Sequence, residues 1–266
     1  MEWFPGGQPE AKPPEVVDQI SNVVPALENL APDILGASEI LNEKALEIAL
    51  YKTNGAHAQV CSAFSDETGV ITPQQIGIAS NLPAQNAWWE SWKPAKVTPK
   101  RGFSFAAFTP SPGVVLLVYA VHLKSNRGNE AENFAMREES AKQILAHVAD
   151  MEKVYANSGR VAVLIGGDFN TSLDDPKFAR ESTLRDLKKA GFTWCWENIP
   201  FEDRITLPTA PSKNPALPPF PDTCFDHVFA KGLNFKSAAV ASVPHNPSDH
   251  RPVIVEFEFP WPTKTP

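Results

Sequence analysis

The sequence predicts an α/β fold in which two β-sheets pack face to face, with helices on the outside. Two observations favour this arrangement. The segments Val114–Val118 and Val161–Ile165 are apolar on both faces, which is typical of central strands that are covered on two sides. Helical and strand-like segments also alternate along the chain without an internal repeat, so we expect residues 1–266 to form a single domain.

The amino-terminal segments predict a helix, a strand and a second helix. A pair of prolines begins the stretch Pro13–Leu30, whose apolar residues follow helical spacing. The short apolar run Asp33–Ile40 is predicted to be a strand, and it carries the acidic Glu39 near its end. A short helix is expected over Glu43–Leu50.

The middle of the chain is rich in predicted strands. Between Ala56 and Tyr119 we expect strands over Gln75–Ser80, Gly102–Phe108 and Val114–Tyr119, separated by proline and glycine turns. A long helix is predicted over Glu130–Tyr155, with its apolar residues at intervals that suit packing on a sheet.

The last third of the chain returns to strands. The apolar strand Val161–Ile165 is followed by a proline-rich loop from Leu207 to Pro221. Strands are then expected near Cys224–Ala230, Phe235–Val243 and Pro252–Phe259. Two facing sheets with outer helices account for this order.

Composition limits the kinds of partner. The net charge of −7 argues against a tight nucleic-acid binder that relies on charge alone, since phosphate contacts favour basic proteins. A nuclease stays open, because an enzyme needs only a local cationic rim. No apolar run approaches about eighteen residues and no leader follows Met1, so we expect a soluble chain without a membrane span.

The three cysteines show neither metal-ligand spacing nor a disulfide framework. Cys61, Cys195 and Cys224 are odd in number and far apart in the sequence. We expect buried free thiols, with one Cys195–Cys224 disulfide as the alternative.

Three short polar motifs lie where predicted strands begin or end. They are Gly167-Asp168-Phe169-Asn170, Phe225-Asp226-His227 and Ser248-Asp249-His250. Catalytic groups gather at the ends of strands on sheet scaffolds. The three motifs therefore indicate one site.

Together with Glu39 and Val121-His122-Leu123-Lys124-Ser125, these motifs resemble the endonuclease/exonuclease/phosphatase superfamily, which includes pancreatic deoxyribonuclease, apurinic endonucleases and neutral sphingomyelinases. The matching residues occur in family order and span most of the chain. The resemblance implies a four-layer αββα sandwich with two mostly antiparallel sheets. It also implies phosphodiester hydrolysis that depends on a divalent metal.

The expected metal ligands are Glu39, Asp168, Asn170 and Asp249. Carboxylate and amide oxygens suit a hard cation, so Mg²⁺ is expected, or Mn²⁺, with Ca²⁺ as another possibility. Glu39 is a lone acid after an apolar strand, which is costly unless it is solvated or bound to something.

The resemblance also implies the catalytic roles. Asp168 would orient or deprotonate the attacking water, and Asn170 would hydrogen-bond the phosphate. His250 would contact a phosphate oxygen while Asp226 orients its ring. His122 resembles the second catalytic histidine of the family.

Three basic residues are candidates for contacts with substrate phosphates. Lys124 and Arg127 follow His122 on what should be the same rim, and Arg101 directly precedes a predicted strand. A solvated face is the alternative for the basic run that ends at Arg101. His227 is left out, because alternation along a strand points it away from Asp226.

The favoured function is a DNA-cleaving endonuclease that acts as a monomer. A phosphatase, or a phosphodiesterase for lipids or small molecules, is the alternative on the same scaffold, and a non-catalytic binding module is a weaker one. In the family, the first strand usually carries an asparagine just before a segment that resembles Glu2–Gly6. Met1 follows that position, so we expect either that upstream residues were removed, with export to a periplasmic or secreted location, or that the first strand is incomplete.

Overall fold

The computed structural model describes Phe4 and residues 12–210, 219–243 and 247–260. Its helices and strands follow one another in the order α1 (Pro13–Leu30), β1 (Ile34–Ile40), α2 (Glu43–Leu50), β2 (His57–Cys61), β3 (Gln75–Ser80), β4 (Asn86–Ser91), β5 (Gly102–Ser111), β6 (Val114–His122), α3 (Glu130–Tyr155), β7 (Arg160–Asp168), α4 (Thr183–Lys189), β8 (Thr193–Trp194), β9 (Asp226–Lys231), β10 (Asn234–Val240) and β11 (Val253–Glu258). Two short 3₁₀ helices lie at Pro176–Phe178 and Phe201–Asp203.

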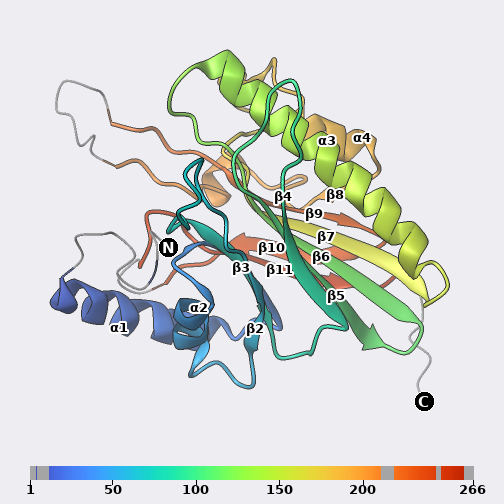
Figure 1. Ribbon diagram of the computed structural model, residues 1–266, viewed down its shortest axis with the longest axis horizontal. Helices are drawn as coiled ribbons and strands as arrows, with labels where there is room; N and C mark the ends of the chain where they lie inside the picture. Colours follow the sequence, from blue (N-terminus) through green and yellow to red (C-terminus); the bar gives the residue numbers. More distant parts are fainter. Residues whose placement is uncertain (1–3, 5–11, 211–218, 244–246, 261–266) are drawn as a thin grey trace.

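The elements form layers, with helices on both outer faces. Figure 1 shows α1 and α2 on one side of the sheets and α3 and α4 on the other. The larger sheet has six strands in the order β4-β5-β6-β7-β9-β8, and a three-stranded sheet has the order β1-β3-β2. The predicted α/β sandwich, with facing sheets and outer helices, is confirmed.

The second sheet layer is divided rather than continuous in the described residues. The hairpin of β10 and β11 forms its own two-stranded ladder, separate from β1-β3-β2. Phe235 and Phe257 of this hairpin pack against the core that lies between the two sheets. The hairpin therefore closes the same core without hydrogen-bonding to the three-stranded sheet.

The centre of the molecule is the pair β6 and β7. All nine residues of β6 are buried, as the two-sided apolar pattern predicted. β6 and β7 run parallel to each other, so the chain must cross over between them, and α3 makes that crossover. Ile144 and Val148 of α3 pack on the outer face of the sheet beside Val115 and Leu117.

The strongest sequence patterns predicted element bounds well, and weaker ones were missed. The predicted bounds of α2, α3 and β3 match the structure. Strand β4 was not predicted, because it lies at the edge of the sheet and its two adjacent tryptophans among polar residues give no clear alternation of apolar and polar positions. Strands β2 and β8 and helix α4 are short and were also not predicted.

All three cysteines are free, and Cys195 and Cys224 are buried, so the expected free thiols are confirmed and the alternative disulfide is wrong. None of the helices in the described part of the chain has the length and apolarity needed to cross a membrane.

Candidate active site

Three neighbouring strands of the larger sheet bring one polar side chain each to the same edge. β6 ends at His122, β7 ends at Asp168, and β9 begins at Asp226. His122 is paired with Asp168 across β6 and β7, and Asp168 is paired with Asp226 across β7 and β9. Because β9 runs against the two parallel strands, its start meets their ends. The sheet register therefore places the three side chains in one row.

The turn after β7 holds the Asp168 carboxylate with its own backbone. Gly167 has a φ of 142°, and a Cβ there would lie 2.0 Å from the Val121 carbonyl oxygen, so only glycine fits. Asn170 has a left-handed φ of 54°, which asparagine tolerates. Its backbone N–H donates to Asp168 Oδ1 (2.8 Å), and its side-chain amide donates to Asp168 Oδ2 (2.9 Å). Both carboxylate oxygens are thereby oriented.

The surroundings of Asp168 favour its protonated form. Only 6% of the residue is exposed, and burial raises its pKa to about 7. The neighbouring carboxylates of Asp226 and Glu39 also raise this pKa, while the positive charge of His250 opposes them. A carboxyl group with a pKa near neutrality can exchange a proton with water at physiological pH.

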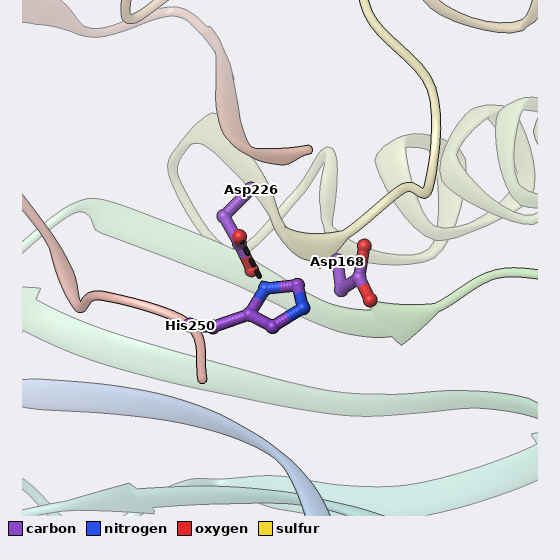
Figure 2. Close-up of side chains that lie close together, drawn as sticks. All are labelled: Asp168, Asp226 and His250. Carbon is purple, nitrogen blue, oxygen red and sulfur yellow. Dashed lines mark hydrogen bonds and ion pairs between the residues drawn. The ribbon is translucent and has the colours of Figure 1, made fainter. Parts of the chain in front are cut away.

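His250 and Asp226 form a close ion pair beside Asp168. His250 Nδ1 lies 2.7 Å from Asp226 Oδ2, and Figure 2 shows the ring next to both carboxylates. Burial alone would lower the pKa of His250, but the charge and hydrogen bond of Asp226 outweigh it and raise that pKa to about 10. Burial likewise opposes ionisation of Asp226, yet His250 lowers the pKa of this carboxyl. The pair is therefore charged at neutral pH.

His122 lies on the other side of Asp168 and has a different character. Its Nε2 is 3.5 Å from Asp168 Oδ2, and the residue is buried. Burial, together with the charges of Arg101 and His250, lowers the pKa of His122 well below its usual value. Its Nδ1 has no hydrogen-bond partner among the described residues. His122 is therefore a neutral imidazole.

Glu39 reaches the site from the three-stranded sheet through two other side chains. It lies in a β-bulge of β1 with a φ of 58°. Gln74 donates from Nε2 to Glu39 Oε1 (3.0 Å), and Arg101 donates from Nη1 to Gln74 Oε1 (2.8 Å). Arg101 also donates to the carbonyl oxygens of His122 (3.2 Å) and Leu123 (2.9 Å). The predicted phosphate-binding Arg101 thus turns inward and links the two sheets.

Three other predicted residues make no direct contact with Asp168 that the structure records, although the charge of Asp249 acts on the neighbouring His250. The Lys124 ammonium donates hydrogen bonds to the carbonyl oxygens of Ser125 (2.9 Å) and Arg127 (2.8 Å), within its own loop. The side chains of Arg127 and Asp249 are exposed. Their roles in substrate and metal binding stay predictions.

The donors at this edge suit a hard divalent cation. Ligand atoms of Asp168, Asp226 and His250 all lie within 4.8 Å of one another. Asp226 Oδ2 and His250 Nδ1 are hydrogen-bonded to each other, so of this group we regard the Asp168 carboxylate as the better ligand. Burial first, and then the charges of Asp226 and Glu39, raise the pKa of Asp168, and a cation bound beside these carboxylates would favour the ionised form of Asp168.

Sequence patterns did not identify several residues that support the site. Gln74 joins Glu39 to Arg101, and Thr206 Oγ1 accepts from the backbone N–H of Asp226 (3.1 Å). No local signal marks either residue, because each acts on a partner far away in the sequence. His227, which the sequence analysis left out of the catalytic set, is buried, and its Nε2 hydrogen-bonds to the Thr171 carbonyl oxygen (2.9 Å).

Comparison by sequence assigns the chain to a family. The model described as "Endonuclease/Exonuclease/phosphatase family" matches residues 6–250. That span contains every motif on which the resemblance rests, so the resemblance is confirmed. No curated protein matches the chain by sequence.

Solved structures share the fold. An endonuclease/exonuclease/phosphatase from Beutenbergia cavernae has a TM-score of 0.68 at 17% identity, covering 97% of this chain and 69% of that one. TDP2 from C. elegans has a TM-score of 0.60 at 15% identity, with 95% and 72% covered. Mannosyl-6-phosphatase Bt3783 from Bacteroides thetaiotaomicron has a TM-score of 0.62 at 16% identity, with 91% of each chain covered. At these identities the similarity shows a common fold.

Proposed function

The chain belongs to the endonuclease/exonuclease/phosphatase family of metal-dependent phosphoesterases, and on that premise we propose that it hydrolyses phosphodiester bonds in DNA. The observation that carries the proposal is the charged His250–Asp226 pair facing a buried Asp168 whose two oxygens are held by Asn170. This arrangement offers a proton acceptor and a positive charge at one edge of the sheet, and phosphoryl transfer needs both.

The proposed roles follow from the charge of each group. Asp168, with its pKa near neutrality, accepts a proton from the attacking water. The water oxygen forms a bond to phosphorus, the bond from phosphorus to the leaving oxygen breaks, and the leaving oxygen takes a proton from solvent. His250 is cationic and donates a hydrogen bond to a non-bridging phosphate oxygen as charge develops there. Asp226 keeps the His250 ring in one orientation and one protonation state.

Oxygen donors from both sheets would hold the cation. We assign Glu39, Asp168, Asn170 and Asp249 as its ligands, as the family motifs imply, and Mg²⁺ as the first ion to test. When bound, the ion polarises the phosphoryl oxygens and lowers the pKa of a bound water. The protein's own contribution is to bury Asp168 and Asn170 and to fix the direction of their side chains.

One observation favours a small phosphoester as a second candidate substrate. A pocket of about 280 Å³ lies where the loop after β7 meets the segment before β9, and its lining includes Asp174, Asp175 and Asp222. Ser172 and Cys224, also in the lining, are two residues from Asn170 and Asp226. Asp174 forms an ion pair with Arg204, so Asp175 and Asp222 would supply the charge that repels a second phosphate of a polyanion, whereas a hydroxyl-rich leaving group could hydrogen-bond to them.

The test compares three substrates under matched conditions. Plasmid DNA, a small phosphodiester and a sugar phosphomonoester are each incubated with Mg²⁺ and with chelator. Nicking of the plasmid that requires Mg²⁺ supports the DNA proposal. Turnover of the monoester alone would replace it with the phosphatase. Absence of metal-dependent turnover on all three would contradict both and favour a non-catalytic module.

A further inference from the structure

A buried ion pair joins α3 to the segment before α4 and takes no part in the chemistry described above. Arg137, on α3, is fully buried and donates from Nε and Nη2 to the two carboxylate oxygens of Glu181, at 2.8 and 2.6 Å. Glu181 precedes α4 and is 3% exposed. Thr183 adds a hydrogen bond to Glu181 Oε1 (2.6 Å). Both carboxylate oxygens of Glu181 therefore accept hydrogen bonds, and these bonds fix the position of the pair.

The third nitrogen of Arg137 points toward the loop after β6. Arg137 Nη1 donates to the Lys124 carbonyl oxygen (2.8 Å) and to Asn126 Oδ1 (3.3 Å). Accepting from Arg137 orients the Asn126 amide, so its Nδ2 faces the opposite way. That Nδ2 donates to the backbone carbonyl oxygen of Asn170 (2.8 Å). The loop after β6 is thus tied to the turn after β7.

Asn170 passes this constraint to the catalytic carboxylate. The backbone carbonyl oxygen of Asn170 accepts a hydrogen bond from Asn126. The backbone N–H and the side-chain amide of Asn170 donate to the two carboxylate oxygens of Asp168. Asn170 has a left-handed φ of 54°, a conformation that persists where the surroundings determine it. The hydrogen bonds therefore run without a break from Glu181 through Arg137, Asn126 and Asn170 to Asp168.

We propose that Glu181, Arg137 and Asn126 are positioning residues that set the direction of the Asp168 carboxylate through Asn170. This inference rests on the proposed function for its catalytic consequence. Buried ion pairs contribute little net stability compared with apolar replacements, so stability alone does not explain a fully buried arginine at this place. Correct placement of reacting groups is worth large factors in rate, and an error of about 1 Å can cost about 100-fold.

The first experiment removes only the link to Asn170. Asn126→Ala should lower kcat about 10- to 100-fold, the effect typical of groups that orient a metal ligand or catalytic side chain, with KM changed less than about twofold. Asn126→Asp keeps an oxygen for Arg137 but loses the donor to Asn170, so it should lose as much. A kcat near wild type for both variants would overturn the proposal.

A matched control lies on the same helix. Asn133 is 2% exposed and donates from Nδ2 to the Arg127 carbonyl oxygen (3.2 Å), in the same loop but without contact to Asn170. Asn133→Ala should leave kcat within about twofold of wild type. An equal loss of kcat in this variant would mean that general loosening of the loop, and not the link to Asn170, matters.

A double variant tests whether the residues act as one series. Arg137→Lys keeps the charge beside Glu181 but cannot reach the four acceptor atoms that the guanidinium contacts. Its effect on kcat should not add to that of Asn126→Ala, because either change breaks the same chain. Fully additive losses would contradict a single series.

Amide hydrogen exchange separates this inference from the proposed function. The N–H of Asn170, bonded to Asp168 Oδ1, should exchange faster in Asn126→Ala than in wild type, and at an unchanged rate in Asn133→Ala. If wild type hydrolyses no phosphoester, the proposed function fails while this measurement still decides the positioning. Equal exchange in all three proteins would overturn it.

Discussion

The site contains two histidine–carboxylate pairs, and their surroundings give them opposite charge states. His250 and Asp226 are 2.7 Å apart and partly exposed, and His250 has a pKa of about 10. His122 and Asp168 are 3.5 Å apart and almost fully buried, which lowers the pKa of the histidine and raises that of the carboxyl to about 7. The same two residue types therefore supply a fixed charge on one side and an exchangeable proton on the other.

The difference shows how one site can carry out acid and base chemistry near pH 7. A short contact that keeps some solvent favours the ions, because each charge stabilises the other. A longer contact in a buried environment favours the neutral forms, because the weaker attraction between the two charges does not compensate for their lost hydration. Environments that push pKa values apart in this way point to the division of roles.

Removal of the Asp168 carboxyl group, which exchanges a proton with water, should have the largest effect on the rate. Asp168→Ala should reduce kcat/KM about 10⁴-fold, the upper range for a general base, while the protein stays folded because it loses a buried, repelled carboxylate. Steady-state kinetics with Mg²⁺ and a circular dichroism melt measure the two quantities. A rate near wild type would assign the wrong residue to water activation.

Removal of the positive charge of His250 should have the second-largest effect on the rate. His250→Ala should lower kcat/KM about 10³-fold, since it removes the cation that faces the phosphate. Asp226→Asn should cause a smaller loss in the same direction, because His250 remains but its charged form loses its partner. The order of the two losses, measured on one substrate, tests the pair. An Asp226→Asn loss greater than that of His250→Ala would contradict it.

Glu39 tests the link between the pairs and the metal. Its charge raises the pKa of Asp168, and it is proposed as a ligand. Glu39→Ala should lower the rate about 10- to 100-fold at low Mg²⁺ and recover most of it at high Mg²⁺, because binding and not proton transfer is impaired. Mg²⁺ titrations of both proteins provide the measurement, and a loss that saturating Mg²⁺ leaves unchanged would exclude the ligand role.

The neutral histidine should matter less than the charged one. His122→Asn removes a 3.5 Å contact with Asp168 but no charge, so we expect about a 10-fold loss of kcat, typical of an orienting group. Comparison with His250→Ala on the same substrate sharpens the contrast. Equal losses would mean that His122 also acts directly on the substrate.

A half-buried histidine outside the site, His147, provides the smallest test. His147 Nδ1 lies 2.9 Å from the Tyr119 hydroxyl, and its Nε2 lies 3.3 Å from Glu90. Burial lowers the pKa of His147 although Glu90 opposes this. The unfolded chain therefore takes up a proton more readily, and stability is lost as the pH falls below about 6.5, with a slope of at most about 1.4 kcal/mol per pH unit.

Urea unfolding at several pH values between 7 and 5 measures that loss. His147→Gln removes the titrating group, so its free energy of unfolding should fall less with pH than that of wild type. Taking the difference between the two proteins cancels the contributions of the other histidines. Equal slopes would show that burial of His147 has no net effect on its protonation.

Sequence patterns identified the members of the site better than their contacts. Asp168, Asp226 and His250 were predicted from motifs at strand ends, and the structure brings all three together. Arg101 was predicted to bind substrate phosphates; its guanidinium donates to the carbonyl oxygens of His122 and Leu123, and its role toward substrate stays a prediction. A charged side chain has the same sequence signature whether it faces solvent or pairs with backbone.

The sequence by itself determined the buried strands, the long helices and the polar residues at their ends, because periodicity and turn residues are local properties of the chain. Only the tertiary structure decided that β9 starts beside the end of β7, that Asn126 reaches Asn170, and that one histidine is charged while the other is neutral. Those outcomes depend on register, burial and distance between residues far apart in the chain. The motifs Gly167–Asn170 and Ser248–His250 state which chemical groups are present, and packing sets their charge.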